Sequence, residues 1–355
     1  MFKVRLLKAA LCTLAVLSTN VYALQFGAPM TASVMVTKPG SPLQKKTVTV
    51  MNIVLTSREK QMAFSYKPKN DNAALLSSSS THLPASVTLG MNHVPVLDQG
   101  LHGTCVTFAA TAAIDAVLNK RDYVSQLCHL TLGAYLEKNG YMPSGWNGTF
   151  GPYALDQMLR FGVVNKSSQA KKTCGGLKDY PGQSFTEEGK PMPLDEYKQI
   201  SEDISSKLYV IQHMSSMQRF ESKFADTNAA EKALTVVKTG IMHGHRFVIG
   251  VLLKMSPYCS AAACANRNEA HDTWALTKEL ELPVTEVGGH EMVVTGYDDN
   301  AIAYDQYGKK HQGLLSLRNS WGNEVGDRGD YYMSYDYFRA FVMEVQEIVE
   351  VPAVS

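Results

Sequence analysis

Alternation of apolar and polar residues divides the chain into a strand-rich beginning, a helical middle and a strand-rich end. Near the N-terminus, "KTVTVMNIVLT" and "QMAFSYK" alternate as strands do, and the polar residues 57–60 between them predict a hairpin loop. "TASVMVTK" predicts a further strand. Later patterning predicts helices over 105–120, 130–138, 152–161, 193–206 and 229–239, then strands over 246–254, 291–297, 301–305, 313–318 and 331–335. This order predicts an α+β protein with two differently built lobes.

The first 23 residues have the pattern of a secretory signal peptide. A basic start is followed by the apolar run "LLKAALCTLAVLST", and "VYA" ends at Ala23 with small residues at the cleavage positions. A retained membrane anchor is the alternative. No other apolar run approaches membrane length. We therefore expect an exported, soluble protein that is secreted or periplasmic.

Residues 24–82 differ in charge from the rest of the chain. They hold seven Lys or Arg against Glu59 and Asp71, a net charge of +5, and they end in the polar, Ser-rich connector "KPKNDNAALLSSSSTH". With the signal's +3 also removed from the overall +1, residues 83–355 carry −7. We expect this basic segment to dock on the acidic body. A net charge near zero disfavours nucleic acid as the main partner.

The cysteines indicate one reactive thiol. Five remain after signal removal, and an odd number in an oxidising compartment favours a free one. We assign Cys105 as free, with two candidate disulfides, Cys259–Cys264 and Cys128–Cys174. Spacing alone does not determine this connectivity, and four structural free thiols are the alternative.

Cys105 follows the glycine-containing loop "DQGLHGTC" and begins an alanine-rich predicted helix. Gly100 and Gly103 allow the loop to turn tightly, and Thr104 is a suitable N-cap. The positive end of a helix dipole stabilises a thiolate. The pattern therefore predicts a nucleophile with a lowered pKa.

A base partner is predicted at His290, which follows Gly288-Gly289 and opens an apolar strand. A satisfied core histidine is the alternative. In "LLSLRNSWGNEVGDRGDYY", Asn319 could orient the imidazole and Trp321 could shield that bond from water. His243 and His245 form an H-x-H pair without further ligands at metal spacing, and "HEMVV" lacks a second histidine, so we expect neither metal nor cofactor.

Four blocks in the same order resemble the papain family of cysteine peptidases. They are "LPASV", "DQGLHGTC", "GGHEMVVTGY" and "LRNSWGNEVGDRGDYY", with a weaker match in "GPYALDQMLRFGVV". The resemblance implies a two-lobed fold with the active-site cleft between a helical lobe, about 95–205, and a barrel-like β lobe, about 206–355. Residues 24–82 would then be a prosegment and 83–355 the peptidase domain.

The resemblance also implies roles. Cys105 would be the nucleophile, His290 the general acid/base and Asn319 its orienting partner, covered by Trp321. The Gln99 amide and the Cys105 backbone N–H would form the oxyanion hole. Substrate would lie against Phe150, Gly151, Gly288 and Gly289, with an apolar S2 pocket, which holds the second residue before the cleaved bond.

Several features depart from the family pattern. His102 and Trp146 stand where the family has a disulfide, with a surface role expected for His102, and residues 256–286 are an insertion. The prosegment is short and β-rich. We expect it to inhibit the enzyme until it is cut within 70–82, with faster maturation in acid; a permanent β extension of the fold is the alternative.

The resulting expectation is a secreted, monomeric cysteine peptidase that is made as a zymogen and acts on protein or peptide substrates. A transamidase on the same fold and a non-catalytic papain-like binding protein are the alternatives. Transglutaminases usually have Asp in the third position, and no G-x-S-x-G indicates a serine hydrolase. Sequons at Asn147 and Asn165 matter only in a glycosylating pathway.

Overall fold

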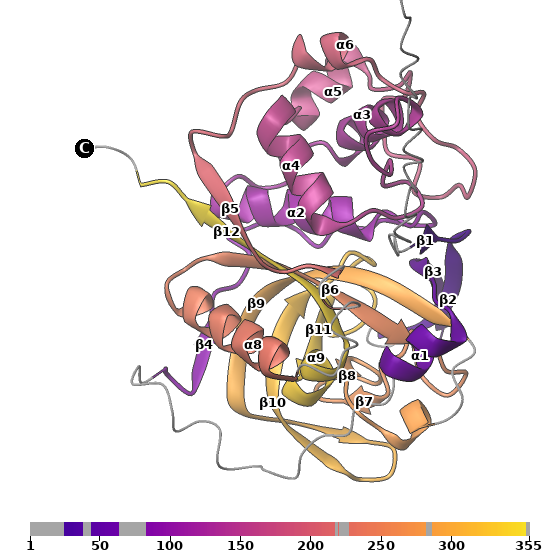
Figure 1. Ribbon diagram of the computed structural model, residues 1–355, viewed down its shortest axis with the longest axis vertical. Helices are drawn as coiled ribbons and strands as arrows, with labels where there is room; N and C mark the ends of the chain where they lie inside the picture. Colours follow the sequence, from indigo (N-terminus) through magenta and orange to yellow (C-terminus); the bar gives the residue numbers. More distant parts are fainter. Residues whose placement is uncertain are drawn as a thin grey trace, which may run out of the picture.

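The computed structural model describes residues 25–37, 44–63, 83–216, 219, 227–281 and 286–352. The expected signal peptide and the Ser-rich connector lie outside these residues. Figure 1 shows one end of the molecule built mainly from helices, and the other built from most of the strands together with further helices. Among the described residues, no helix combines the length and the hydrophobicity that a membrane span requires.

The helical end is built from α2 (Cys105–Val117), α3 (Gln126–Lys138), α4 (Gly151–Phe161), α5 (Lys166–Lys172) and α6 (Leu194–Lys198). The predicted helices over 105–120, 130–138 and 152–161 are confirmed. Side chains of Ser125 and Asn165 cap α3 and α5 by accepting backbone N–H groups. The helix predicted over 193–206 is wrong beyond Lys198. Its continuation instead pairs Glu202 with Val163 as an isolated bridge.

The β end is built around one long strand. It contains β4 (Ser86–Thr88), β5 (Leu208–Met214), β6 (Arg246–Lys254), β7 (Ala265–Asn266), β8 (Thr273–Trp274), β9 (Val287–Asp305), β10 (Lys310–Arg318), β11 (Asp330–Ser334) and β12 (Val342–Glu350). The runs predicted at 291–297 and 301–305 are one strand, β9. Strands pair in the order β10-β11-β8-β7-β9-β6-β12-β5, and β10 also pairs with β9. That last pairing closes a ring of strands resembling a small barrel.

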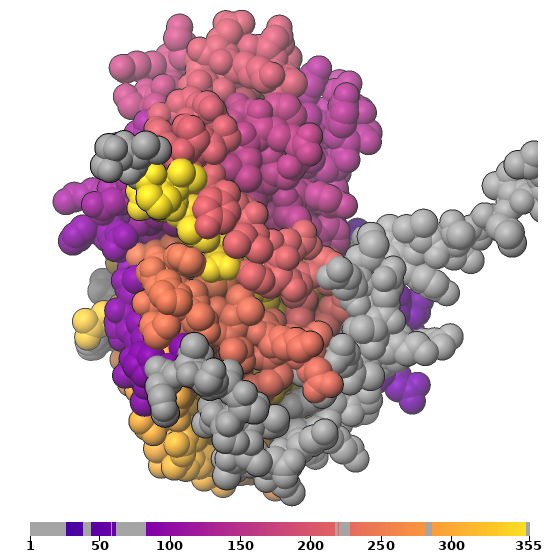
Figure 2. Space-filling model, turned by 60° about the vertical axis from the view of Figure 1, so that its left-hand side comes forward, coloured from indigo at the N-terminus to yellow at the C-terminus, as the bar shows by residue number. Residues whose placement is uncertain are grey.

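Two helices and a 3-10 turn lie at the β end. They are α8 (Thr227–Met242), α9 (Tyr335–Phe341) and a 3-10 turn, η2 (Lys278–Glu281). The helix predicted over 229–239 is confirmed as α8. Figure 2 shows the yellow C-terminal end of the chain, where β12 ends, at the surface between the magenta helical end and the orange strands. β12 pairs with β5 and β6, and the helices α2 and α4 of the helical end contact it.

The N-terminal strands lie where the two ends of the molecule meet (Figure 1). They are β1 (Gln25–Phe26), β2 (Met30–Val36) and β3 (Gln44–Val54), followed by α1 (Ser57–Ala63). The predicted hairpin loop at 57–60 is wrong, because β3 pairs with the preceding β2 and a helix begins at Ser57. Thr56 and Glu59 form a capping box, each side chain accepting the other's backbone N–H.

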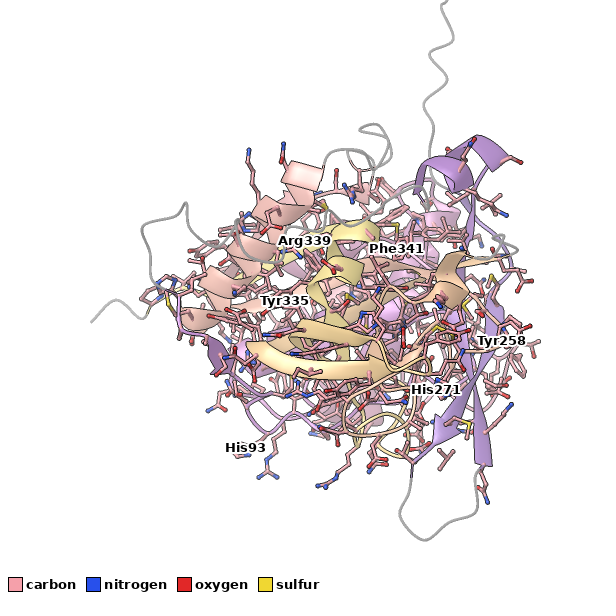
Figure 3. The ribbon with its side chains drawn as sticks, turned by 90° about the horizontal axis from the view of Figure 1, so that it is seen from below. His93, Tyr258, His271, Tyr335, Arg339 and Phe341 are labelled. Atoms are coloured by element: carbon pink, nitrogen blue, oxygen red, sulfur yellow. A yellow bond between two sulfur atoms is a disulfide. The ribbon has the colours of Figure 1, made fainter. Side chains whose placement is uncertain are left out.

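The insertion at 256–286 runs beside these strands. The Met35 N–H donates to Ser260 Oγ at 3.1 Å, and the Cys259–Cys264 disulfide closes the loop next to it. Figure 3 places Tyr258 and His271 on this side of the molecule. The insertion therefore supports the outer strand of the N-terminal segment.

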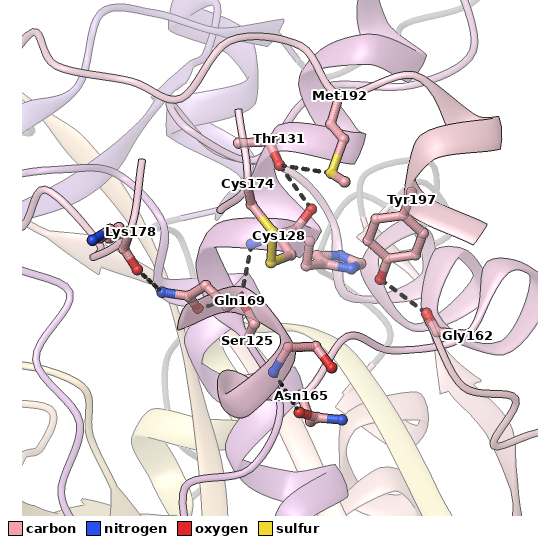
Figure 4. Close-up of a disulfide and its surroundings, with 12 residues drawn as sticks. Ser125, Cys128, Thr131, Gly162, Asn165, Gln169, Cys174, Lys178, Met192 and Tyr197 are labelled. Atoms are coloured by element: carbon pink, nitrogen blue, oxygen red, sulfur yellow. Dashed lines mark hydrogen bonds between the residues drawn. A yellow bond between two sulfur atoms is a disulfide. The ribbon is translucent and has the colours of Figure 1, made fainter. Parts of the chain in front are cut away.

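The second disulfide, Cys128–Cys174, ties α3 to the segment that follows α5 (Figure 4). Ser125 accepts the Cys128 N–H and donates to Gln169, whose amide reaches the Lys178 carbonyl. Both disulfides have the pairing predicted from the sequence. Cys105 is the free cysteine of the described residues.

Loss of the two disulfides should have unequal effects on stability. They span sequence separations of 46 and 5 residues. In the chain-entropy model the longer loop contributes about 4 kcal/mol and the shorter about 2 kcal/mol. Urea unfolding of the Cys128→Ala/Cys174→Ala protein should therefore show the larger loss in free energy, with Cys259→Ala/Cys264→Ala as its matched control. Equal losses would contradict the model.

Candidate active site

Cys105 is the first residue of α2 and is fully buried. Every residue of that helix from Cys105 to Ala116 is buried between the helical end and the sheet. The Cys105 sulfur accepts hydrogen bonds from the backbone N–H groups of Val106 and Glu291. Thr104 occupies the N-cap without a side-chain capping bond; its hydroxyl bonds the Tyr180 hydroxyl at 2.9 Å instead.

The loop before Cys105 depends on Gly100. Its φ is +58°, and a Cβ there would lie 1.9 Å from the Gly182 carbonyl oxygen. Only glycine fits this left-handed, close-packed position. The turn holds Gln99 next to the start of α2.

His290 lies on β9 and pairs with Asn319, as the sequence analysis expects. Their Nε2 and Oδ1 atoms are 2.7 Å apart, and the Trp321 ring stacks on the imidazole with centroids 4.4 Å apart. Asn319 Oδ1 also accepts the Ser320 N–H. Because an amide oxygen only accepts, the Nε2 proton is fixed on the Asn319 side and Nδ1 is left as an acceptor. Nδ1 is buried and has no hydrogen-bond partner among the described residues.

Gln99 is held from several sides. Its backbone N–H donates to the Ser320 carbonyl, and its side-chain oxygen accepts from the Ser320 hydroxyl at 2.7 Å. This fixes Nε2 as the outward donor. Nε2 then donates to two carbonyl oxygens at 3.0 Å each, those of His102 and Thr49.

The Thr49 carbonyl belongs to the N-terminal segment. β3 crosses the site and continues to β9, where Met51 pairs with Gly289 and Asn52 with Gly288, directly before His290. Phe26 of β1 packs on Phe150 with ring centroids 4.8 Å apart. The segment therefore covers both sides of the site and presents a backbone carbonyl to the Gln99 amide.

Lys46, near the start of β3, holds the N-terminal segment to the rest of the protein. Its ammonium group lies 2.6 Å from carboxylate oxygens of both Asp98 and Glu324, and it donates to the Trp321 carbonyl at 2.8 Å. Burial lowers the pKa of Lys46, but these hydrogen bonds and charges outweigh it and raise the pKa. A basic residue of the segment thus meets acidic residues of the body, as the charge distribution predicts.

Under this cover both reactive groups are uncharged. Burial raises the pKa of the Cys105 thiol to about 12, with the Glu291 carboxylate acting in the same direction. Burial lowers the pKa of His290 to about 4 despite the bond to Asn319. The lowered thiol pKa predicted from the helix dipole is wrong for this covered state, because loss of solvent outweighs the helix N-terminus.

The four predicted substrate-contacting residues surround the covered site, with Phe150 and Gly151 at the start of α4 and Gly288 and Gly289 on β9. A Cβ at Gly289 would lie 2.5 Å from Ile53 of the segment. A Cβ at Gly151 would lie 2.7 Å from Gln346 Oε1 and 2.9 Å from Glu291 Oε1. The apolar surroundings expected behind Gly151 are therefore wrong, since the side chains there are polar.

His102 is buried, so the surface position expected for it is also wrong. Its ring packs edge-on against Trp146 with centroids 4.9 Å apart. The two residues that stand where the family has a disulfide thus contact each other. An aromatic contact here occupies the position of the missing covalent link.

Residues 277–353 match the model of the Peptidase C1-like family, a range that includes His290 and Asn319. The chain resembles the papain-like cysteine peptidases. This confirms the resemblance indicated by the sequence blocks and supports the enzyme class, a papain-like cysteine peptidase. No curated protein sequence matches the chain.

Solved structures of cysteine proteases are similar at low identity. Xylellain, a cysteine protease from Xylella fastidiosa, is 18% identical with a TM-score of 0.47, covering 81% of this chain and 91% of its own. Procathepsin B from Trypanosoma congolense is 14% identical with a TM-score of 0.44, covering 81% and 82% respectively. Digestive procathepsin L 3 of Tenebrio molitor is 16% identical with a TM-score of 0.41, covering 84% and 83%.

Sequence reasoning missed the roles of Thr49, Lys46 and Ser320. Thr49 contributes only its backbone carbonyl, which every residue type has, so the sequence does not indicate this role. Lys46 belongs to the pair Lys45-Lys46 at the start of an apolar run. That position could have indicated a lysine held by an ion pair, whereas the net charge of the segment does not single out any one residue. Ser320 lies between Asn319 and Trp321 and could have been inferred from that position.

Proposed function

We propose that this chain is the precursor of an exported papain-like cysteine peptidase that hydrolyses peptide bonds through a thioester intermediate. The observation that carries the proposal is the hydrogen bond from Gln99 Nε2 to the Thr49 carbonyl, beside the buried Cys105. A fixed amide N–H that donates to a peptide carbonyl next to a thiol is what acyl transfer requires. Two disulfides are consistent with an oxidising compartment.

In this mechanism His290 Nδ1 takes the Cys105 proton, and the thiolate attacks the carbonyl carbon of the scissile bond. The Gln99 amide and the Cys105 backbone N–H stabilise the oxyanion. His290 then gives its proton to the leaving amine, which leaves a thioester on Cys105. Water, deprotonated by the same imidazole, hydrolyses the thioester and restores the thiol.

The described N-terminal segment would inhibit this reaction. It excludes water from Cys105 and His290, it occupies the Gln99 donor, and it is held by Lys46 and by strand pairing to β9. With a thiol pKa near 12, only on the order of 10⁻⁴ of the cysteine would be thiolate at pH 8. Cleavage within 70–82, followed by release of the segment, would open the site.

Intact-mass labelling tests the proposal. The full chain (residues 24–355) and its Cys105→Ala counterpart are treated with an irreversible epoxide inhibitor of thiol proteases, before and after limited proteolysis in 70–82. We expect one equivalent of label on the parent alone, and faster labelling after proteolysis. An unlabelled Cys105 after release of the segment would reject the peptidase and favour the binding protein. Product analysis with added amine acceptors separates hydrolysis from transamidation.

A further inference from the structure

Three polar side chains are buried together behind the start of α4. Glu291 on β9, Glu344 on β12 and Gln346 on β12 are at most 3% exposed. Gly250 of β6 stands between the two glutamates in the strand register, opposite Glu291 on one side and Glu344 on the other. Gly250 and Gly151 have no side chains, and the side chains of Glu291, Glu344 and Gln346 lie against the positions that Cβ atoms would take there.

The hydrogen bonding of this cluster is incomplete. Glu344 accepts the Gly151 N–H at 2.9 Å and a bond from Ser216. Glu291 Oε1 and both polar atoms of Gln346 are buried without a hydrogen-bond partner. Buried polar atoms are almost always satisfied, because an unpaired one costs about 1–3 kcal/mol. Two of these atoms, Glu291 Oε1 and Gln346 Oε1, are acceptors at one place, which indicates that a hydrogen-bond donor is missing.

The missing partner should be a cation. Two carboxyl groups share the site, and no Lys or Arg is paired with them in the described residues. Burial raises the pKa of Glu344 to about 7, and burial and the Glu344 charge raise that of Glu291. A guanidinium or ammonium group would neutralise the pair and donate to the unpaired oxygens.

The cluster is next to the reacting atoms. Glu291 directly follows His290, and its backbone N–H donates to the Cys105 sulfur. Its other neighbour, Gly151, follows Phe150, which Phe26 of the N-terminal segment covers. A Cβ at Gly148 would lie 3.0 Å from Phe26 and 3.1 Å from Met51, so the segment lies directly over this loop. Release of the segment would uncover the approach to Glu291 and Gln346.

We propose that Glu291, Glu344 and Gln346 form the specificity pocket for an arginine or lysine side chain of the peptide substrate. The proposal rests on the proposed peptidase function and replaces the apolar S2 pocket. The planar guanidinium is the better match, because its fork can donate to two carboxylates and one amide oxygen together. Glu344 accepts the Gly151 N–H at the start of α4, and Glu291 lies next to Cys105.

The test compares substrates that differ in charge alone. Fluorogenic peptides carry arginine, its neutral isostere citrulline, or leucine at the second residue before the cleaved bond. They are assayed with the chain after proteolysis in 70–82, and Cys105 labelling is measured in parallel. The parent should favour arginine over citrulline by about 10- to 100-fold in kcat/KM. Glu344→Gln should remove most of that preference, and Glu350→Gln, exposed on the same strand, should keep it.

The outcomes are distinct. Hydrolysis of all three peptides without a preference for arginine would overturn the pocket and leave the peptidase function standing, and this comparison needs only the parent protein. A preference that survives both Glu344→Gln and Glu291→Gln would also overturn it. No hydrolysis together with an unlabelled Cys105 would reject the peptidase function, and the pocket with it.

Discussion

Replacing His290 with Ala is expected to lower kcat/KM for peptide hydrolysis by about 10³- to 10⁴-fold in the segment-free enzyme. The imidazole has two separate tasks, accepting the thiol proton and protonating the leaving amine. Its position is fixed by the 2.7 Å bond to Asn319 and the stacked Trp321 ring. Loss of the ring removes both proton transfers at once, while Gln99 and the peptide-binding surface stay in place.

The measurement is steady-state hydrolysis after limited proteolysis, with circular dichroism to verify folding. His93→Asn is the matched control, since His93 is exposed (Figure 3) and its positive φ of 66° is one that asparagine tolerates. The control should keep parental activity. A loss of less than tenfold in the His290 variant would mean that another group transfers the protons.

Acid is expected to loosen the N-terminal segment from the body. Burial lowers the pKa of His290 from 6.5 to about 4, so the covered state binds fewer protons than the uncovered state between these values. As pH falls through that range, uncovering should become easier by up to about tenfold per pH unit. Above pH 9, ionisation of the uncovered thiol would also favour release, because burial raises its pKa to about 12.

Hydrogen exchange of the β3 amides, corrected for intrinsic rates, measures this directly in the Cys105→Ala chain. Protection should decline from pH 6.5 to 4. Two variants separate the sources. His290→Gln should flatten the part of the slope that belongs to the imidazole, and Lys46→Met should lower protection at every pH by removing the ion pairs. Protection that is constant from pH 7 to 4 would refute acid release.

The candidate catalytic side chains could be predicted because each proposed chemical role demands a particular residue type. Cys105, His290 and Asn319 stand in recognisable local contexts, and the last two are joined by a hydrogen bond. The predicted bounds 246–254 are those of β6, because this strand is buried at every position. Helix α5 was missed because its sequence, "KSSQAKK", has no apolar stripe and depends on the Asn165 cap.

Contacts between distant segments could not be predicted in the same way. The partner of β3 was misjudged because alternation predicts a strand but not its neighbour. The prediction of a lowered thiol pKa was wrong because the burial of Cys105 depends on the segment that covers the site. That segment is distant in sequence: Thr49, which bonds Gln99, lies 50 residues before it. The carboxylates behind Gly151 come from β9 and β12, which only the folded sheet brings together.

The N-terminal segment is part of the hydrophobic core of the β end. Val34, Val48, Val50 and Ile53 are buried in the same cluster as Trp274 and Met292. Each such side chain contributes roughly 1.5–3 kcal/mol through burial. Departure of the segment therefore removes stabilisation from the domain that remains. Maturation would convert a stable, inactive precursor into an active enzyme with a shorter lifetime. The cleavage that starts proteolysis would therefore also limit how long the enzyme stays active.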